Sequence, residues 1–128
     1  MNAMALVFLG GGLGASLRYV AVHALFALGG MGAAWAIMTV NIVGSLVMGM
    51  MLALGQKGAL TLGTTQTQLF LLTGMLGGFT TFSAFSADVL KIMQSGHYGV
   101  ALTYILGSVV LSLLAVFAGY YLLIGKTL

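Results

Sequence analysis

The near-absence of charge constrains this sequence more than any other feature. Its 128 residues include four Lys or Arg and one Asp or Glu, whereas 61% are hydrophobic. A water-soluble domain has about a quarter of its residues charged, but here the charged residues make up 4%. Most of the chain must therefore face something other than water, and this composition favours a lipid bilayer.

Four long apolar runs account for most of the chain. Each can cross a hydrocarbon core about 30 Å thick, which takes about 20 residues of α-helix. The runs are Ala3–Leu28, Ala33–Leu54, Leu69–Met93 and Tyr98–Ile124. None alternates apolar and polar residues as a membrane-spanning strand would. We therefore predict an all-α integral membrane protein in which residues 1–128 form a single four-helix transmembrane domain.

The composition also excludes several classes of function. Without cysteine, the chain can form neither a disulfide scaffold nor a cysteine zinc site. Four basic residues are too few for a nucleic-acid-binding face. We predict that the chain is not an enzyme, because its single carboxylate, Asp88, allows no carboxylate pair and no nucleophile–base pair can be argued. Proton-coupled transporters commonly use an intramembrane acid or His, so this pattern favours passive permeation of a small anion.

The basic residues hardly favour one orientation in the membrane. In a four-helix chain Lys57 and Lys126 fall on one side, whereas Lys91 and, deeper in its span, Arg18 fall towards the other. The positive-inside rule depends on a difference between the two sides. Either the rule lacks resolution for so few charges, or the chain inserts both ways up and pairs as an antiparallel dimer.

Small residues recur four positions apart in three of the runs. The pairs are Gly10 and Gly14, Ser45 and Gly49, and Gly74 and Gly78. Such faces let helix backbones approach closely in lipid. Packing within one chain and contact between two chains both remain open.

The third run has an unusual polar centre, Gly77-Gly78-Phe79-Thr80-Thr81-Phe82-Ser83. Glycine weakens a helix, and threonine hydroxyls can bond backbone groups in a non-helical turn. We therefore predict that the third helix breaks in mid-membrane near Gly77–Thr80. The carbonyls freed by such a break can bind a cation, and the freed amides favour an anion. The alternative is a continuous, glycine-rich packed helix.

Other side chains could line an anion path beside this break. Phe82 and Phe85 share a helix face, and ring edges are partly positive. Asn41 brings an amide donor to the middle of the second run, and it must find a partner or line a polar cavity. A stripe in the fourth run adds Tyr104, Ser108 and Ser112. The same patterns also fit an aromatic core, an inter-helix hydrogen bond and serines bonded to their own helix.

Charged side chains near the spans need partners. Arg18 is costly in lipid unless it reaches water, so it could attract anions at a pore mouth or anchor its helix. Asp88 and Lys91 are three apart on one helix and can pair.

At these residues the sequence resembles the Fluc (CrcB) family of fluoride channels. Gly10–Tyr19 resembles the family's glycine-rich segment that ends in an arginine and an aromatic residue. Asn41 is followed by Gly44, and Gly77–Ser83 with Phe85–Asp88 resembles the family's long third-helix motif. The resemblance covers nearly the whole chain.

The resemblance implies a passive, fluoride-specific ion channel that exports cytoplasmic fluoride and reduces its toxicity. HF enters cells uncharged and ionises inside, so that fluoride accumulates as an anion that cannot cross the membrane by itself. A passive anion channel lets this fluoride leave. The resemblance further implies an antiparallel, dual-topology homodimer with two pores in the bacterial inner membrane. Its partners would be fluoride, a second copy of the chain and the lipid bilayer.

The family pattern also implies roles for individual residues. The fluoride pathway would include Asn41, Phe82, Ser83, Phe85, Tyr104, Ser108 and Ser112. Within it, Phe82 and Phe85 would form an aromatic box, and Asn41 would donate to the ion. Ser83 and the stripe on the fourth run would form or support a hydroxyl track.

Three more positions have implied roles outside that track. Arg18 would lie at the aqueous vestibule. Carbonyls of Gly77 and Thr80 from both protomers would hold a structural Na⁺ that is not transported, since four carbonyls suit a hard cation.

Two positions depart from the family pattern, and other functions remain open. Ala84 replaces the usual Ser or Thr, and Asp88 replaces the usual Glu. A small dual-topology multidrug exporter would have the same size and number of spans. Such exporters carry a carboxylate in the first helix, which this chain lacks. A non-transporting membrane assembly subunit would explain the glycines and the low charge. It would not need Asn41, the helix break and the shared face of Phe82 and Phe85 together.

Overall fold

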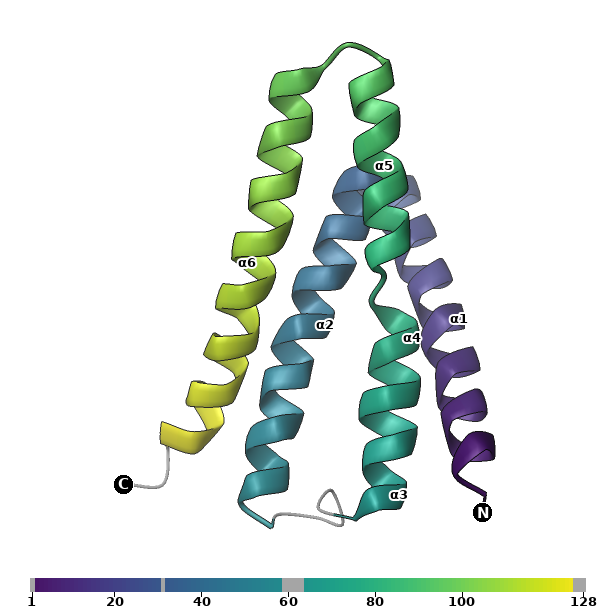
Figure 1. Ribbon diagram of the computed structural model, residues 1–128, viewed down its shortest axis with the longest axis vertical. Coiled ribbons are helices and arrows are strands. Elements are labelled where there is room, and N and C mark those ends of the chain that lie inside the picture. The colour runs from purple at the N-terminus through teal and green to yellow at the C-terminus, as the bar shows by residue number, and fades with distance from the viewer. Residues whose placement is uncertain (1, 31, 59–63, 126–128) are drawn as a thin grey trace.

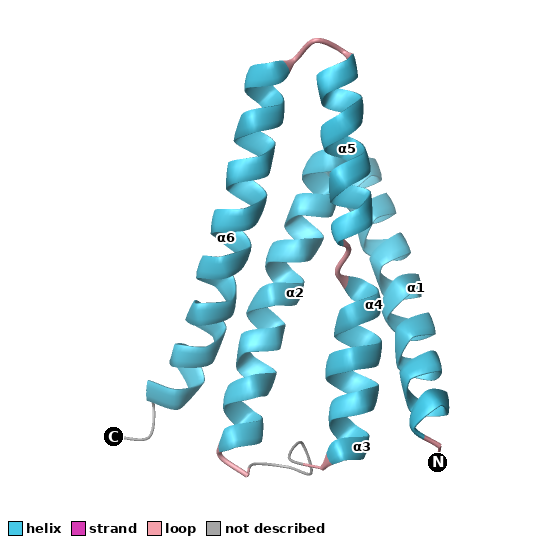
Figure 2. Cartoon of the chain, viewed as in Figure 1, coloured by secondary structure: helices cyan, strands magenta, loops and turns pink. Residues whose placement is uncertain are grey.

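The computed structural model describes residues 2–30, 32–58 and 64–125. Throughout these residues the secondary structure is helical, with turns and no strand (Figures 1 and 2). The elements are α1 (Ala3–Gly29), α2 (Ala33–Gln56), α3 (Thr65–Thr67), η2 (Gln68–Leu76), α4 (Gly77–Phe79), α5 (Phe82–Gln94) and α6 (Tyr98–Ile124). The predicted all-α class is confirmed.

Four helical segments are long and apolar enough to cross a membrane. They are α1, α2, the joined segment Thr65–Gln94 and α6, with 27, 24, 30 and 27 residues. The prediction of four helices of spanning length is therefore confirmed. The third span begins at Thr65, four positions before the predicted run, because Thr64 accepts a hydrogen bond from the Thr67 amide and caps the helix.

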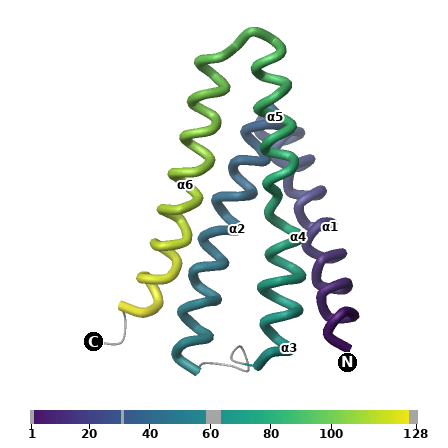
Figure 3. Tube along the Cα trace, viewed as in Figure 1, coloured from purple at the N-terminus to yellow at the C-terminus, as the bar shows by residue number. Residues whose placement is uncertain are grey.

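The chain passes back and forth along one direction, so that α1 begins and α6 ends at the same end of the molecule (Figure 3). Lys57 follows α2 at this end, where its ammonium donates to the Leu123 carbonyl. Lys91 lies in the last turn of α5, near the opposite end. Lys126, which also entered the orientation argument, lies outside the described residues.

The spans pack as two pairs that are not consecutive in sequence. α1 packs along η2 and α4, and α2 packs along α6. A Cβ at Gly14 would collide with the Met75 carbonyl, and one at Gly49 with the Val116 carbonyl. The contact of α1 with the third span also includes Gly10, Gly74 and Gly78. The glycines of these small-residue faces therefore take part in packing within one chain.

The third span bends at Thr80 and Thr81. Both residues are extended, with φ −83° and ψ 154° at Thr80 and φ −151° and ψ 119° at Thr81. The Thr80 amide and hydroxyl both donate to the Leu76 carbonyl over 3.0 Å and close α4. The Thr81 hydroxyl accepts from the Ala84 amide over 3.2 Å and caps α5. The bend thus follows the predicted glycine pair, which itself stays helical.

Little of the surface is buried inside a single chain. A small core joins Ile37, Phe85 and the fully buried Tyr104. Large apolar side chains elsewhere are exposed, such as Phe8 at 78% and Leu114 at 60%. Apolar surface on this scale requires lipid or another chain around it.

Candidate functional site

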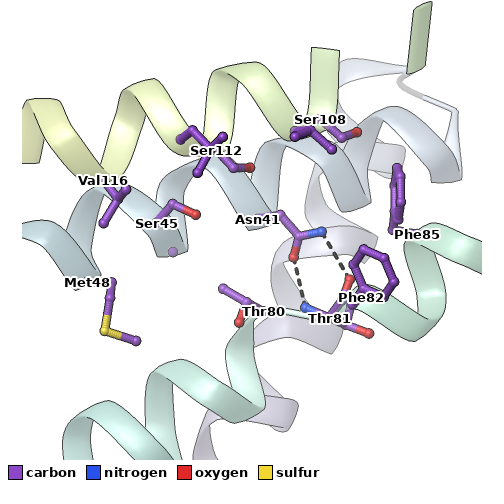
Figure 4. A pocket seen from close by; sticks show the side chains of 13 residues that line it. Asn41, Ser45, Met48, Thr80, Thr81, Phe82, Phe85, Ser108, Ser112 and Val116 are labelled. Carbon is purple, nitrogen blue, oxygen red and sulfur yellow. Dashed lines mark hydrogen bonds between the residues drawn. The ribbon is translucent and has the colours of Figure 1, made fainter. Parts of the chain in front are cut away.

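A groove of about 410 Å³ opens beside the bend, between α2, α5 and α6 (Figure 4). Of the predicted site residues, the groove brings together Asn41, Thr80, Phe82, Phe85, Ser108 and Ser112. It is lined as well by residues outside the predicted fluoride pathway and metal site, namely Gly44, Ser45, Met48, Thr81, Val109, Leu113 and Val116. The wall is therefore mostly apolar with a few polar groups, as is usual for a ligand site.

Asn41 holds the bent backbone from α2. Its Nδ2 donates to the Thr81 carbonyl over 3.1 Å, and its Oδ1 accepts from the Thr81 amide over 2.8 Å. The inter-helix hydrogen bond considered as an alternative is therefore present. An amide NH₂ carries two hydrogens, so one remains for a ligand in the groove.

The two phenylalanines differ in their surroundings. Their ring centroids lie 5.3 Å apart with the planes tilted by 45°. Phe85 is 8% exposed and stands 5.4 Å from the Tyr104 ring, whereas Phe82 is 76% exposed. Phe85 thus belongs both to the core and to the groove wall, while Phe82 is fixed by few contacts within the chain.

The predicted hydroxyl track is only partly assembled in one chain. Ser108 is 5% exposed, and its hydroxyl has no hydrogen-bond partner among the described residues. Tyr104 lies behind the wall, fully buried in the core, and its hydroxyl likewise has no hydrogen-bond partner among the described residues. Ser83 is exposed, with its hydroxyl 3.2 Å from that of Thr81, and it does not line the groove.

Arg18 reaches the bend from α1. Its Nη1 donates to the Thr80 carbonyl over 3.2 Å. This bond gives the guanidinium a partner within its span, which a charge in lipid requires. Arg18 also lines a separate groove of about 290 Å³ with Tyr19 and His23.

The two positions that depart from the family pattern, Ala84 and Asp88, both lie on α5. Asp88 pairs with Lys91 at 3.7 Å, as the sequence predicted. Lys91 is 74% exposed, so the pair adds little to stability. Ala84 packs against the core of Ile37, Phe85 and Tyr104.

The backbone at the bend offers hard oxygen donors. The Thr81 amide, which would bond the Gly77 carbonyl in a continuous helix, donates to Asn41 instead. Gly77 is exposed as a residue. The Thr80 carbonyl has a second lone pair beyond the bond from Arg18. Such oxygens fit a hard cation such as Na⁺, but one chain supplies too few of them to enclose it.

The comparisons with known proteins agree with the resemblance seen in the sequence. Residues 5–120 match the family described as "CrcB-like protein, Camphor Resistance (CrcB)". A relative from Chelativorans sp. (strain BNC1) is 42% identical over 95% of this chain and 96% of its own length. One from Thermus thermophilus is 43% identical over 95% of each chain.

A third relative, from Agrobacterium fabrum (strain C58), is 41% identical over 100% of this chain and 99% of its own. All three relatives carry the name "Fluoride-specific ion channel FluC". Together with the four apolar helices, these matches indicate a multi-pass membrane protein. The chain belongs to the CrcB family.

Proposed function

We propose that this protein is a fluoride-specific ion channel through which cytoplasmic fluoride leaves the cell passively. The observation that carries the proposal is the groove at the bend, where the Asn41 amide, two phenylalanine rings and the unpartnered Ser108 hydroxyl converge. The names of the relatives support the same function.

These groups suit a small, strongly hydrated anion. An anion that enters the groove loses water, so it needs donors that replace the lost hydrogen bonds. The free amide hydrogen of Asn41 and the serine hydroxyls can donate, and ring edges of Phe82 and Phe85 add positive potential. The groove is lined by no acidic residue or His among the described residues, so it offers no proton carrier for coupled export.

The proposed assembly is an antiparallel homodimer with two pores in the bacterial inner membrane. The groove is open on one side, and Phe82 is 76% exposed although it lines the groove. A second copy would cover both features, and a two-fold axis would create two equivalent pathways. The near-even distribution of Lys and Arg is compatible with insertion in both orientations.

A structural Na⁺ would lie between the two bends of this dimer. Each chain would contribute the carbonyls of Gly77 and Thr80, which are hard donors. The bound ion would supply positive charge where two carbonyl clusters otherwise repel each other. It would hold the interface together and would not be transported.

Ion flux from proteoliposomes tests the function directly. Vesicles loaded with KF and treated with valinomycin should release fluoride rapidly, while vesicles loaded with KCl should retain chloride. Absence of fluoride efflux from inserted dimers in the presence of sodium would contradict the proposal. A tag fused to the C-terminus tests dual topology, because it should be accessible from both faces of the membrane; a single orientation would refute it.

A further inference from the structure

Two sets of helical serine and threonine hydroxyls in the described residues contrast with each other. Exposed Ser16, Ser86 and Thr103 donate to the carbonyl four residues earlier, over 2.8, 2.9 and 2.9 Å. This internal bond satisfies a hydroxyl where the surroundings offer no polar partner.

The second set lines the groove and makes no such bond. Within the part of the chain that the structure describes, the hydroxyls of Ser45, Ser108 and Ser112 have no hydrogen-bond partner. Leaving a hydroxyl unpaired in an apolar wall is unfavourable. All three hydroxyls are therefore available to something that occupies the groove.

Ser45 is the member of this set to which the family resemblance assigned no role. It stands one helical turn after Asn41 on α2, so both side chains are on the same face. Figure 4 places it between Asn41 and Met48, with Ser112 on the neighbouring helix α6. Beyond this level the groove is lined by Met48 and Val116, which are apolar.

Packing gives no separate reason for a hydroxyl here. The close contacts between α2 and α6 are made by neighbouring residues and not by the Ser45 hydroxyl: a Cβ on Gly49 would strike the Val116 carbonyl, and one on Gly119 the Leu46 carbonyl. Alanine at position 45 would fill nearly the same volume as serine without an unpaired polar group.

We propose that Ser45 is a further fluoride-pathway residue, whose hydroxyl donates to the ion as it passes between α2 and α6. The assignment rests on the proposed function. Ser45 supplies a donor from α2 at the level where Ser112 supplies one from α6. It thereby extends the polar lining by one helical turn past Asn41, up to the apolar end at Met48 and Val116.

The test compares Ser45→Ala with Ser16→Ala in KF-loaded proteoliposomes. The two variants make the same chemical change, but Ser16 is exposed on α1 and bonded to its own helix. A lost hydrogen bond to a charged group predicts a fall in fluoride flux of at least about tenfold for Ser45→Ala. Ser16→Ala should stay within about twofold of the wild type. Ser45→Thr keeps a hydroxyl and should retain more flux than Ser45→Ala.

Two further measurements separate a donor from a structural residue. Ser45→Ala should leave the thermal unfolding temperature unchanged, because no intramolecular bond is lost. The double variant with Ser112→Ala should show non-additive losses, since both hydroxyls would serve the same ion.

The possible outcomes are distinct. If the wild-type protein conducts fluoride and Ser45→Ala conducts it as well as Ser16→Ala does, this assignment is overturned and the proposed function still stands. A loss of flux that Ser45→Thr shares in full, with a lowered unfolding temperature, would also overturn it in favour of a packing role. A wild-type protein without fluoride flux would overturn both.

Discussion

The side chain of Asn41 and the backbone of Thr81 form a closed pair of hydrogen bonds between α2 and the bend of the third span. The side-chain amide of Asn41 thus supplies the hydrogen-bond partners that the backbone N–H and C=O of Thr81 would have in a continuous helix. The groove lies at this contact, so the position of the proposed pathway depends on it.

Replacing Asn41 by leucine should release the bend. Two hydrogen bonds are lost in a nearly constant volume, so the free energy of unfolding should fall by about 1–3 kcal/mol. Hydrogen exchange at the Thr81 amide should become at least about tenfold faster, and fluoride flux should fall with it. An unchanged exchange rate at Thr81 would show that another group holds the bend.

Phe82 and Phe85 should respond differently to replacement by isoleucine. Phe82→Ile should reduce fluoride flux about tenfold, because the ring edge is lost, while packing within each chain changes little, since Phe82 is 76% exposed there. Phe85→Ile should also destabilise the protein by about 1 kcal/mol or more, since this ring packs against Tyr104. Normal flux in Phe82→Ile would contradict the role proposed for Phe82.

Arg18 should be more than an anchor. Arg18→Met removes the bond to the Thr80 carbonyl and should lower the free energy of unfolding by about 1–3 kcal/mol. Arg18→Lys keeps the charge and should recover part of both stability and flux. If the methionine and lysine variants both unfold at the wild-type temperature, the bond to the Thr80 carbonyl contributes nothing to the stability of the protein.

Gly14 and Gly12 provide a matched pair on α1. Gly14→Ala places a methyl group against the Met75 carbonyl, whereas a Cβ at Gly12 meets nothing within 4 Å. The first change should destabilise the protein by about 1–3 kcal/mol or more, and the second should be neutral or stabilising by up to about 1 kcal/mol. Thermal unfolding in detergent measures both, and equal effects would mean that α1 and η2 separate easily.

Removal of sodium should weaken the proposed dimer. Exchange of Na⁺ for N-methylglucamine would remove a ligand that, in the proposed dimer, binds only the assembled protein, so the unfolding temperature should fall and rise again with added sodium. Size-exclusion chromatography in the same buffers should show dissociation. A dimer that is indifferent to sodium would leave the carbonyls of Gly77 and Thr80 without the proposed role.

The four spans could be predicted because hydropathy and length determine them almost alone. The glycine pair and the two threonines predicted a break near Gly77–Thr80; the structure has a bend there, with Thr80 and Thr81 as the extended residues. The nine-residue π-helical segment η2 could not be predicted, since no composition marks this form of helix.

Of the contacts at the bend, sequence reasoning offered an inter-helix hydrogen bond for Asn41 but not its partner Thr81. Nothing in the chain indicates that Arg18 reaches Thr80, because the choice of neighbour depends on how the spans pack. Ser45 did carry a signal, its spacing of four from Asn41. That spacing was taken as part of a small-residue face shared with Gly49, and only the groove separates the two roles.

The pairing of the first span with the third, and of the second with the fourth, has a consequence for biosynthesis. Gly14 meets its contact at Met75 only after some 60 further residues have been made, which takes about 3–12 s at common elongation rates. During that interval the glycine faces of α1 and α2 have no matching surface. A newly inserted half-chain therefore leaves both faces without their packing partners until the later helices enter the membrane.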